Sequence, residues 1–194
     1  MGARVILLAG PSGAGKSRLA AGSRLPILQL DDFYKDGDDP SLPRFAGGAV
    51  DWDHPQSWDP EAALVTVVDL CHVGKTDAPV YEISENRRVG SHVLDLDGSA
   101  YVIAEGIFAA ELAAGCLDAG VLARAICVRR SRWVTFVLRL ARDLREHRKP
   151  PLVLLRRGWR LTCREPMIVA ALVALGCAAM TPRQAEQFLA TLPR

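Results

Sequence analysis

The sequence is poor in aromatic residues and has no long apolar segment. The first feature argues against a nucleic-acid-binding surface, and the second argues against a membrane-spanning helix. Phe, Trp and Tyr make up 6% of the 194 residues, and the basic part of the chain offers little aromatic character beyond Trp133 and Trp159. Surfaces that stack nucleic-acid bases use more aromatic side chains, so we do not expect nucleic-acid binding. The longest apolar run, residues 167–180, has 14 residues. It is too short to span a bilayer, so it predicts a buried helix and no membrane partner.

Cysteine is also scarce, and its five positions show no pairing pattern. Cys71, Cys116, Cys127, Cys163 and Cys177 are scattered and odd in number, and none forms a C-x-x-C pair. This usage indicates small core residues in a reducing compartment, and we expect a cytoplasmic protein without a secretory leader. An apolar content of 49% and a charged content of 24% are typical of a globular protein, and the length predicts a single domain over residues 1–194.

The net charge of +2 conceals an uneven distribution of charge along the chain. Residues 1–97 hold nine basic and fifteen acidic side chains, whereas residues 98–194 hold fifteen basic and seven acidic ones. Twelve of the basic residues lie between Arg129 and Arg164. Three interpretations are open: a solvated basic face, a nucleic-acid surface, or a lid that closes over a polyphosphate. The lid explains the cluster better than a nucleic-acid surface does, and for most of the individual arginines we expect a solvated position.

A phosphate-binding loop is the most specific motif in the chain. Residues 10–17 read Gly-Pro-Ser-Gly-Ala-Gly-Lys-Ser, which matches the pattern G-x-x-x-x-G-K-[ST] between an apolar strand and a helix. Its glycines allow backbone N–H groups to curl around an anion, and the helix N-terminus adds partial positive charge. We therefore predict ATP binding by the loop, with Lys16 at the terminal phosphates and Ser17 at Mg²⁺. The predicted nucleotide contacts are Gly10, Ser12, Gly13, Ala14, Gly15, Lys16 and Ser17.

Apolar runs alternate with helical segments, which predicts an α/β fold with a parallel central sheet. Strands are expected over residues 5–9, 26–30, 79–83, 101–104 and 125–128, and helices from Pro60, over 132–148 and from Pro182. Ligands of parallel sheets bind beyond the carboxyl ends of the strands. The phosphate loop, Asp31 and Glu105 each follow a strand, so we expect them at one site.

The accessory residues favour a small-molecule kinase among the proteins that use phosphate loops. A GTPase should contain an Asn-Lys-x-Asp motif, and the sequence has no Asn-Lys pair. A kinase needs a carboxylate near the acceptor hydroxyl and cationic groups over the phosphates. Arg139 and Arg142 lie three residues apart on one face of the predicted lid segment, about residues 132–160, and could both reach the phosphates.

Four segments of the chain resemble the uridine kinase family, within the wider uridine kinase and phosphoribulokinase group. They are the phosphate loop, Leu30-Asp31-Asp32-Phe33-Tyr34, Trp52-Asp53-His54-Pro55-Gln56-Ser57-Trp58-Asp59, and Val102-Ile103-Ala104-Glu105-Gly106-Ile107. Weaker likenesses are Pro79-Val80-Tyr81-Glu82 and residues 139–143. The order and spacing match over residues 4–148, and residues 149–194 match nothing. The resemblance implies a three-layer P-loop kinase fold with an Arg-rich lid.

The resemblance also implies roles for individual residues. Asp31 would accept the proton of the acceptor hydroxyl, and Ser17, Asp31 and Glu105 would place Mg²⁺ directly or through water. Lys16, Arg139 and Arg142 would act on the phosphates. The acceptor contacts would be Asp53, Tyr81, Asn86 and Arg88. His54 is expected to be a structural turn residue.

The acceptor side departs from the family pattern. Asn86 stands where the family has a base-contacting His, Glu82 replaces an Asp, and Asp32 replaces a Ser. We expect a kinase that uses ATP and Mg²⁺ to phosphorylate a hydroxyl of a nucleoside or a similar small molecule. The alternatives are a kinase for a vitamin precursor or sugar, a catalytically decayed regulatory module, and a nucleic-acid-linked ATPase. Association of copies of the chain is left open.

Overall fold

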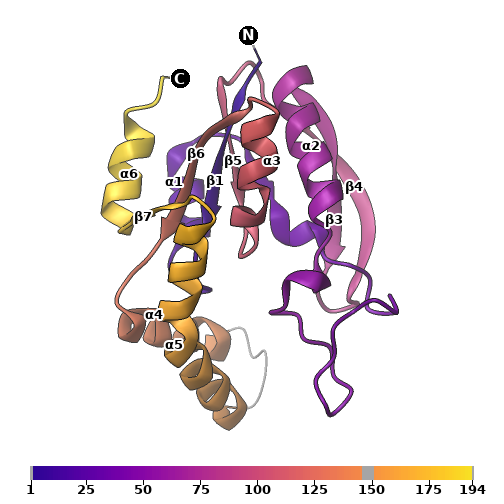
Figure 1. Ribbon diagram of the computed structural model, residues 1–194, viewed down its shortest axis with the longest axis vertical. Coiled ribbons are helices and arrows are strands. Elements are labelled where there is room, and N and C mark those ends of the chain that lie inside the picture. The colour runs from indigo at the N-terminus through magenta and orange to yellow at the C-terminus, as the bar shows by residue number, and fades with distance from the viewer. Residues whose placement is uncertain (1, 146–150, 194) are drawn as a thin grey trace.

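A five-stranded parallel sheet forms the centre of the computed structural model, which describes residues 2–145 and 151–193 (Figure 1). The strand order is β2-β5-β1-β6-β7. The strands are β1 (Arg4–Ala9), β2 (Ile27–Gln29), β5 (Tyr101–Glu105), β6 (Leu122–Val128) and β7 (Ala178–Met180). The two strands that flank β1 follow it late in the chain, so helices must cross over between them.

Helices cover both faces of this sheet, because alternate side chains of β1 point to opposite sides. Val5, Leu7 and Ala9 belong to one buried cluster, which includes residues of α2 (Pro60–Val73), η3 (Ala109–Leu112) and α3 (Ala113–Asp118). Ile6 and Leu8 belong to a second cluster, with residues of α1 (Lys16–Ser23) and α6 (Pro182–Ala190). The result is the three-layer α/β arrangement that the sequence predicts.

Two helix starts predicted from the sequence are confirmed by their caps. The Asp59 side chain accepts a hydrogen bond from the Ala62 backbone N–H at 3.0 Å, and Pro60 is the first residue of α2. The Thr181 and Gln184 side chains form a reciprocal capping box at the start of α6. Each side chain satisfies a backbone group that the first helical turn leaves without an intrahelical partner.

A β-hairpin stands beside the central sheet, and sequence patterns predicted only part of it. β3 (Lys75–Glu82) pairs antiparallel with β4 (Arg87–Asp95) in a separate two-stranded sheet. The prediction of a short strand at residues 79–83 captured the end of β3 and missed β4. Nearly every residue of β4 is exposed, so its sequence lacks the apolar alternation that marks a half-buried strand.

The strand predicted at residues 26–30 is shorter than expected. β2 covers Ile27–Gln29, and Leu30 begins the 3-10 turn η1 (Leu30–Phe33). A second 3-10 turn, η2 (Pro55–Ser57), lies in the connection between η1 and α2. The early end of β2 places Asp31 and Asp32 in η1 rather than directly at the end of a strand.

The buried helix predicted at residues 167–180 is wrong. Helix α5 (Pro151–Ala174) ends before this run does, and Gly176 at φ 91° turns the chain into β7. Met167 is 74% exposed, because the run faces the core through only part of its length. A continuous apolar segment does not by itself distinguish a helix from a turn followed by a buried strand.

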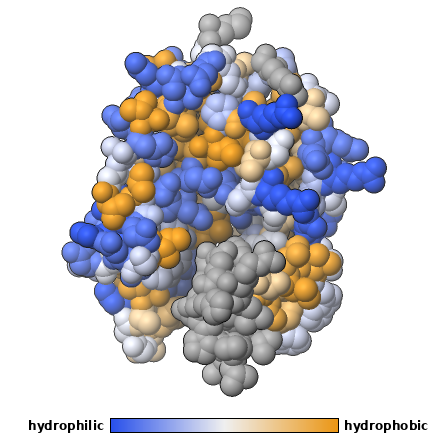
Figure 2. Space-filling model, turned by 180° about the vertical axis from the view of Figure 1, so that it is seen from behind, coloured by the Kyte–Doolittle hydropathy of each residue, from blue (hydrophilic) through white to orange (hydrophobic). Residues whose placement is uncertain are grey.

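Helices α4 (Arg132–Arg145) and α5 pack against each other and extend beyond the carboxyl ends of the strands, at the bottom of Figure 1. Figure 2 shows the molecule from behind, with one apolar patch at the lower right, near this end, and others in the upper half. Trp133 and Trp159, one from each helix, are exposed and lie 5.8 Å apart between ring centroids. Within the described ranges, no helix combines the length and the apolar character that a bilayer crossing needs.

Candidate active site

The phosphate loop between β1 and α1 adopts the conformation that its glycines permit. Gly10, Gly13 and Gly15 have φ values of 141°, 85° and 98°, where residues with a side chain are strained. A methyl group on Gly10 would also lie 2.4 Å from the carbonyl oxygen of Val128, at the end of β6. The loop therefore needs glycine at this position both for its dihedral angles and for its contact with the sheet.

Lys16 is the first residue of α1, and its side chain folds back over the loop. Its Nζ donates a hydrogen bond to the Gly10 carbonyl oxygen at 2.9 Å, and the residue is only 8% exposed. A buried ammonium held above a ring of backbone N–H groups makes the loop strongly attractive to an anion. Ser12 and Ala14 complete the loop, and Ala14 is buried.

Ser17 and Glu105 meet across the space between α1 and β5. The Ser17 Oγ donates a hydrogen bond to Glu105 Oε1 at 2.7 Å, and Glu105 is 5% exposed. Burial raises the pKa of the Glu105 carboxyl above its ordinary 4.5, while the Ser17 hydrogen bond and the Lys16 charge act in the opposite direction. The two side chains thus present oxygen atoms together next to the phosphate loop.

Asp31 lies in η1, against the residue that follows Glu105. A methyl group placed on Gly106 would come within 3.2 Å of Asp31 Oδ1, so glycine leaves this carboxylate room at the edge of the sheet. The negative charge of Asp31 also contributes to the raised pKa of Glu105. The structure therefore brings Lys16, Ser17, Asp31 and Glu105 to one place.

Asp32 points to the hairpin rather than to the loop. Its Oδ1 accepts a hydrogen bond from the Tyr81 backbone N–H at 3.1 Å. Desolvation raises the pKa of this carboxyl, and the neighbouring Asp31 charge raises it further. Asp32 thus attaches η1 to β3 and fixes the direction in which the adjacent Asp31 leaves the chain.

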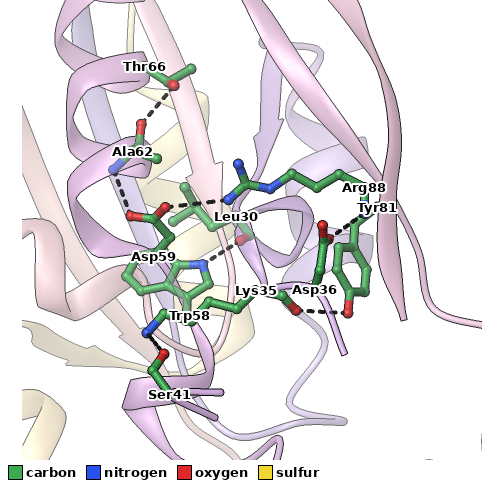
Figure 3. A network of polar contacts seen from close by, with 10 residues as sticks. All are labelled: Leu30, Lys35, Asp36, Ser41, Trp58, Asp59, Ala62, Thr66, Tyr81 and Arg88. Carbon is green, nitrogen blue, oxygen red and sulfur yellow. Dashed lines mark hydrogen bonds and ion pairs between the residues drawn. The ribbon is translucent and has the colours of Figure 1, made fainter. Parts of the chain in front are cut away.

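A network of polar contacts joins η1, α2 and the hairpin (Figure 3). The Arg88 guanidinium contacts Asp59 Oδ2 at 3.5 Å, and the Arg88 backbone N–H donates to Asp36 Oδ1 at 2.8 Å. The Trp58 Nε1–H donates to the Leu30 carbonyl oxygen at 2.7 Å in the buried core. The Trp58 contact holds η1 in place, and the Arg88 contacts join the hairpin to the start of α2 and to the segment that follows η1.

Aromatic rings line the same region and were not singled out as a group from the sequence. The Tyr34 ring lies 5.7 Å from Trp52, 6.0 Å from Tyr81 and 6.1 Å from Phe108, between centroids. The Tyr81 hydroxyl donates to the Lys35 carbonyl oxygen at 3.2 Å. Residues from four separate segments meet here, so only the folded chain reveals the cluster.

The other predicted acceptor residues occupy more peripheral positions. Asp53 is exposed in the turn before η2, and its backbone N–H donates to Asp51 at 3.3 Å. Asn86 stands at the tip of the hairpin with φ 50°, and its carbonyl oxygen accepts from the Gly37 N–H at 2.6 Å. His54 accepts from the Gln56 N–H through Nδ1, which agrees with the structural role expected for it.

The predicted phosphate-contacting arginines lie in α4, and the side chains of Arg139 and Arg142 are outside those that the structure describes. A different arginine touches the loop. Arg130, between β6 and α4, donates from Nε to the Ala14 carbonyl oxygen at 3.0 Å. The sequence did contain an indication of this residue, because Arg129 and Arg130 follow the strand predicted at residues 125–128, as Asp31 and Glu105 follow theirs.

Further candidate groups for this site are the cysteines and the possible metal ligands. Burial raises the pKa values of Cys71, Cys116, Cys127 and Cys177, as expected for core thiols, whereas Cys163 is exposed, so the expectation of a core position is wrong for this cysteine. Over the ranges that the structure covers, no group of three or more His, Cys, Asp or Glu side chains is arranged to hold a metal ion. A cation here would have to share its coordination with phosphate and water oxygens.

Comparisons with known proteins agree with this geometry. No protein-family model matches the chain. It is 35% identical over 113 residues to a uridine kinase of Schizosaccharomyces pombe, and the matched region makes up 55% of this chain and 25% of that protein. It is 29% identical over 110 residues to a uridine kinase of Ligilactobacillus salivarius, and the matched region makes up 53% of this chain and 50% of that protein. The chain thus spans half or less of the length of these curated relatives.

A solved structure described as a putative fructose transport system kinase from Silicibacter sp. TM1040 has a TM-score of 0.64 to this chain, at 19% identity. The matched region makes up 88% of this chain and 85% of the chain in that structure. Together these similarities confirm the resemblance that the motifs indicated and the P-loop kinase fold.

Proposed function

We propose that this uridine kinase-like chain is a phosphotransferase that moves the γ-phosphate of ATP to a hydroxyl group of a nucleoside. The observation that carries the proposal is the meeting of Ser17 and Glu105 at 2.7 Å, beside Lys16 and Asp31 at one edge of the sheet. Glu105 beside Ser17 fits the cation that accompanies a bound nucleotide, which a site that only binds nucleotide also needs. A site that transfers phosphate needs a further carboxylate, here Asp31, because the acceptor hydroxyl must lose its proton.

The phosphate loop would hold the donor nucleotide. Its backbone N–H groups and the start of α1 attract the phosphate chain, and Lys16 would exchange the Gly10 carbonyl for a phosphate oxygen. This exchange places the ammonium where negative charge is spread over the transferred group. Arg139 and Arg142 of α4 are proposed to approach the same phosphates when ATP is bound.

The residues at this site fit Mg²⁺, a hard cation that prefers oxygen ligands. Ser17 Oγ and Glu105 Oε1 lie next to each other and next to the phosphate loop, and Asp31 lies near Glu105. Few protein carboxylates together with phosphate and water oxygens are typical of magnesium sites in kinases. Bound there, the ion would neutralise charge on the phosphates. It would also lower the cost of keeping the buried Glu105 ionised.

Asp31 is the proposed acceptor of the hydroxyl proton. It is exposed near the start of η1, and Gly106 leaves space beside its carboxylate. The hydrogen bond between Asp32 and the Tyr81 N–H, and that between Trp58 and the Leu30 carbonyl, fix the turn on both sides of Asp31. A loosely bonded transition state needs this positioning more than it needs a strong base.

A nucleoside acceptor is proposed because of the aromatic cluster around Tyr34 and Tyr81. Flat rings offer stacking surfaces for a base, and polar groups at their edges can fix its orientation. Within this proposal Tyr81 and Arg88 contact the acceptor, and Asp53 and Asn86 approach it from the exposed loops. The relatives named uridine kinase favour this acceptor class.

A second acceptor class is favoured by one observation. Asn86 replaces the histidine that the family pattern has for base contact, and its backbone already bonds Gly37 at the tip of the hairpin. An acceptor without a base, such as a sugar or a vitamin precursor, would not need a contact there.

The test is a coupled assay of ADP release over a panel of nucleosides, sugars, pantothenate and sugar phosphates. We expect Mg²⁺-dependent turnover with at least one member, and strong loss of it in Asp31→Asn with ATP binding retained. Asp118→Asn, at the end of α3, is the matched control because it removes a remote exposed carboxylate. Measurable ATP binding without turnover on any acceptor would reject the proposal in favour of a regulatory module.

A further inference from the structure

Arg130 occupies a position against the phosphate loop that neither the motif nor the relatives assign. It lies in the short connection between the end of β6 and the start of α4. Its Nε–H donates to the Ala14 carbonyl oxygen at 3.0 Å, and the side chain is half-buried. Two cationic side chains therefore contact the phosphate loop, Lys16 from α1 and Arg130 from the segment after β6.

The orientation of this guanidinium leaves part of its donor set available. One donor, Nε, is committed to Ala14, while Nη2 lies 3.6 Å from the place where a side-chain carbon of Gly15 would stand. The terminal N–H groups thus lie along the Ala14–Gly15 edge of the loop, whose backbone N–H groups cradle phosphate.

The charge of Arg130 is not neutralised by a neighbouring carboxylate. Across the side chains that the structure describes, the ion pairs within 4 Å are Arg87 with Glu85 and Arg88 with Asp59. A half-buried guanidinium without a carboxylate partner is unusual, because burial of charge is costly unless it is paired. A bound anion would supply the missing partner.

We propose that Arg130 is a nucleotide-binding residue that contacts the phosphate chain of the bound nucleotide from the Ala14–Gly15 edge of the loop. The inference rests on the proposed function for the presence of a nucleotide. The Ala14 hydrogen bond fixes the plane of the guanidinium before the ligand arrives, so little side-chain freedom is lost on binding. Lys16 acts as a mobile point charge, whereas Arg130 acts as a fixed donor.

The experiment measures binding of ATP and of inorganic tripolyphosphate by calorimetry to the full chain and four variants. Arg130→Ala removes the side chain, Arg130→Gln keeps a donor for the Ala14 carbonyl without the charge, and Arg130→Lys keeps the charge. Arg129→Ala is the matched control, because Arg129 is the adjacent exposed arginine. Thermal unfolding of each variant shows whether the fold is intact.

We expect Arg130→Ala and Arg130→Gln to weaken binding of both ligands by about 10–100-fold, the range for a hydrogen bond between charged groups. Arg130→Lys should recover only part of this loss, because it keeps the charge and loses the fixed guanidinium plane. Arg129→Ala should bind within about threefold of the unaltered chain, because an exposed charge is screened by solvent. Full affinity in Arg130→Gln would mean that the residue only braces the loop, which overturns the inference. A loss for ATP without a loss for tripolyphosphate would place the contact on the base and also overturn it.

The outcomes separate this inference from the proposed function. If the unaltered chain binds both ligands and Arg130→Ala binds them equally well, the inference fails and the kinase proposal stands. If the unaltered chain binds neither ligand, the kinase proposal fails and the inference fails with it.

Discussion

Substitution of Gly106 by Ala tests whether the position of Asp31 controls phosphoryl transfer. The added methyl carbon would lie 2.8 Å from Leu30 Cβ and 3.2 Å from Asp31 Oδ1. Carbon atoms in contact are ordinarily about 3.5–4.0 Å apart, so η1 must move away by about 0.7–1.2 Å. Leu30 Cβ is attached directly to the backbone and cannot turn aside, so the displacement carries Asp31 with it.

A displacement of this size should lower turnover and stability and leave ATP affinity nearly unchanged. Misplacement of a reacting group by about 1 Å can lower turnover 100-fold, so we expect kcat to fall by about 10–100-fold. Overpacking costs about 1–3 kcal/mol, which corresponds to a fall of roughly 2–10 °C in the Tm of a chain of this size. ATP affinity should stay within about twofold, because the phosphate loop is not displaced.

The assay is ADP release at saturating ATP with the acceptor that gives the highest turnover. Gly22→Ala in α1 is the matched control, because nothing lies within 4 Å of the added carbon. It should keep full turnover and gain about 0.5–1 kcal/mol in stability, as glycine is unfavourable inside a helix. If Gly106→Ala folds normally and its kcat is unchanged, the proposed role of Asp31 is refuted.

Three further substitutions test the site and its support. Glu105→Gln should raise the Tm without ligand at about pH 7–8 and lower Mg²⁺-dependent turnover at least about tenfold. Burial raises the folded-state pKa of Glu105, so the native state is most stable when this carboxyl is protonated. This stability is fully present below pH 4.5 and is lost as the pH rises through the folded-state pKa. A Tm gain of Glu105→Gln that does not shrink toward pH 4.5 would contradict this. Trp58→Phe should cost about 1–3 kcal/mol in denaturant unfolding, because the buried Leu30 carbonyl loses its donor, and an unchanged midpoint would show that the bond is not needed. Asp59→Ala should cost about 0.5–2 kcal/mol through the loss of the cap on Ala62; in calorimetry, no change in Tm would contradict the capping role.

The site elements that depend on local sequence were predictable, because each carries its own local pattern. The phosphate loop needs glycines and a lysine at fixed spacing, and the cap of α2 needs Asp59 before Pro60. The convergence of the phosphate loop, Asp31 and Glu105 followed from one general property of parallel sheets. None of these predictions required knowledge of a contact between distant residues.

The remaining features depend on tertiary contacts that a sequence pattern does not contain. β4 is exposed along its length and is held by its pairing with β3, so no apolar alternation marks it. The approach of Arg130 to Ala14 depends on the spacing between β6 and the loop. Asn86 matched a family position by count along the chain, but its left-handed backbone places it in a turn.

The most direct test of the central claim follows the phosphate itself. ATP labelled in its γ-phosphate would be incubated with the chain, Mg²⁺ and either uridine or cytidine, and the products separated by chromatography. The proposed function predicts a labelled nucleoside monophosphate that disappears when Mg²⁺ is chelated and in Asp31→Asn. Label that remains in ATP, or that appears only as inorganic phosphate with every nucleoside tried, would contradict it.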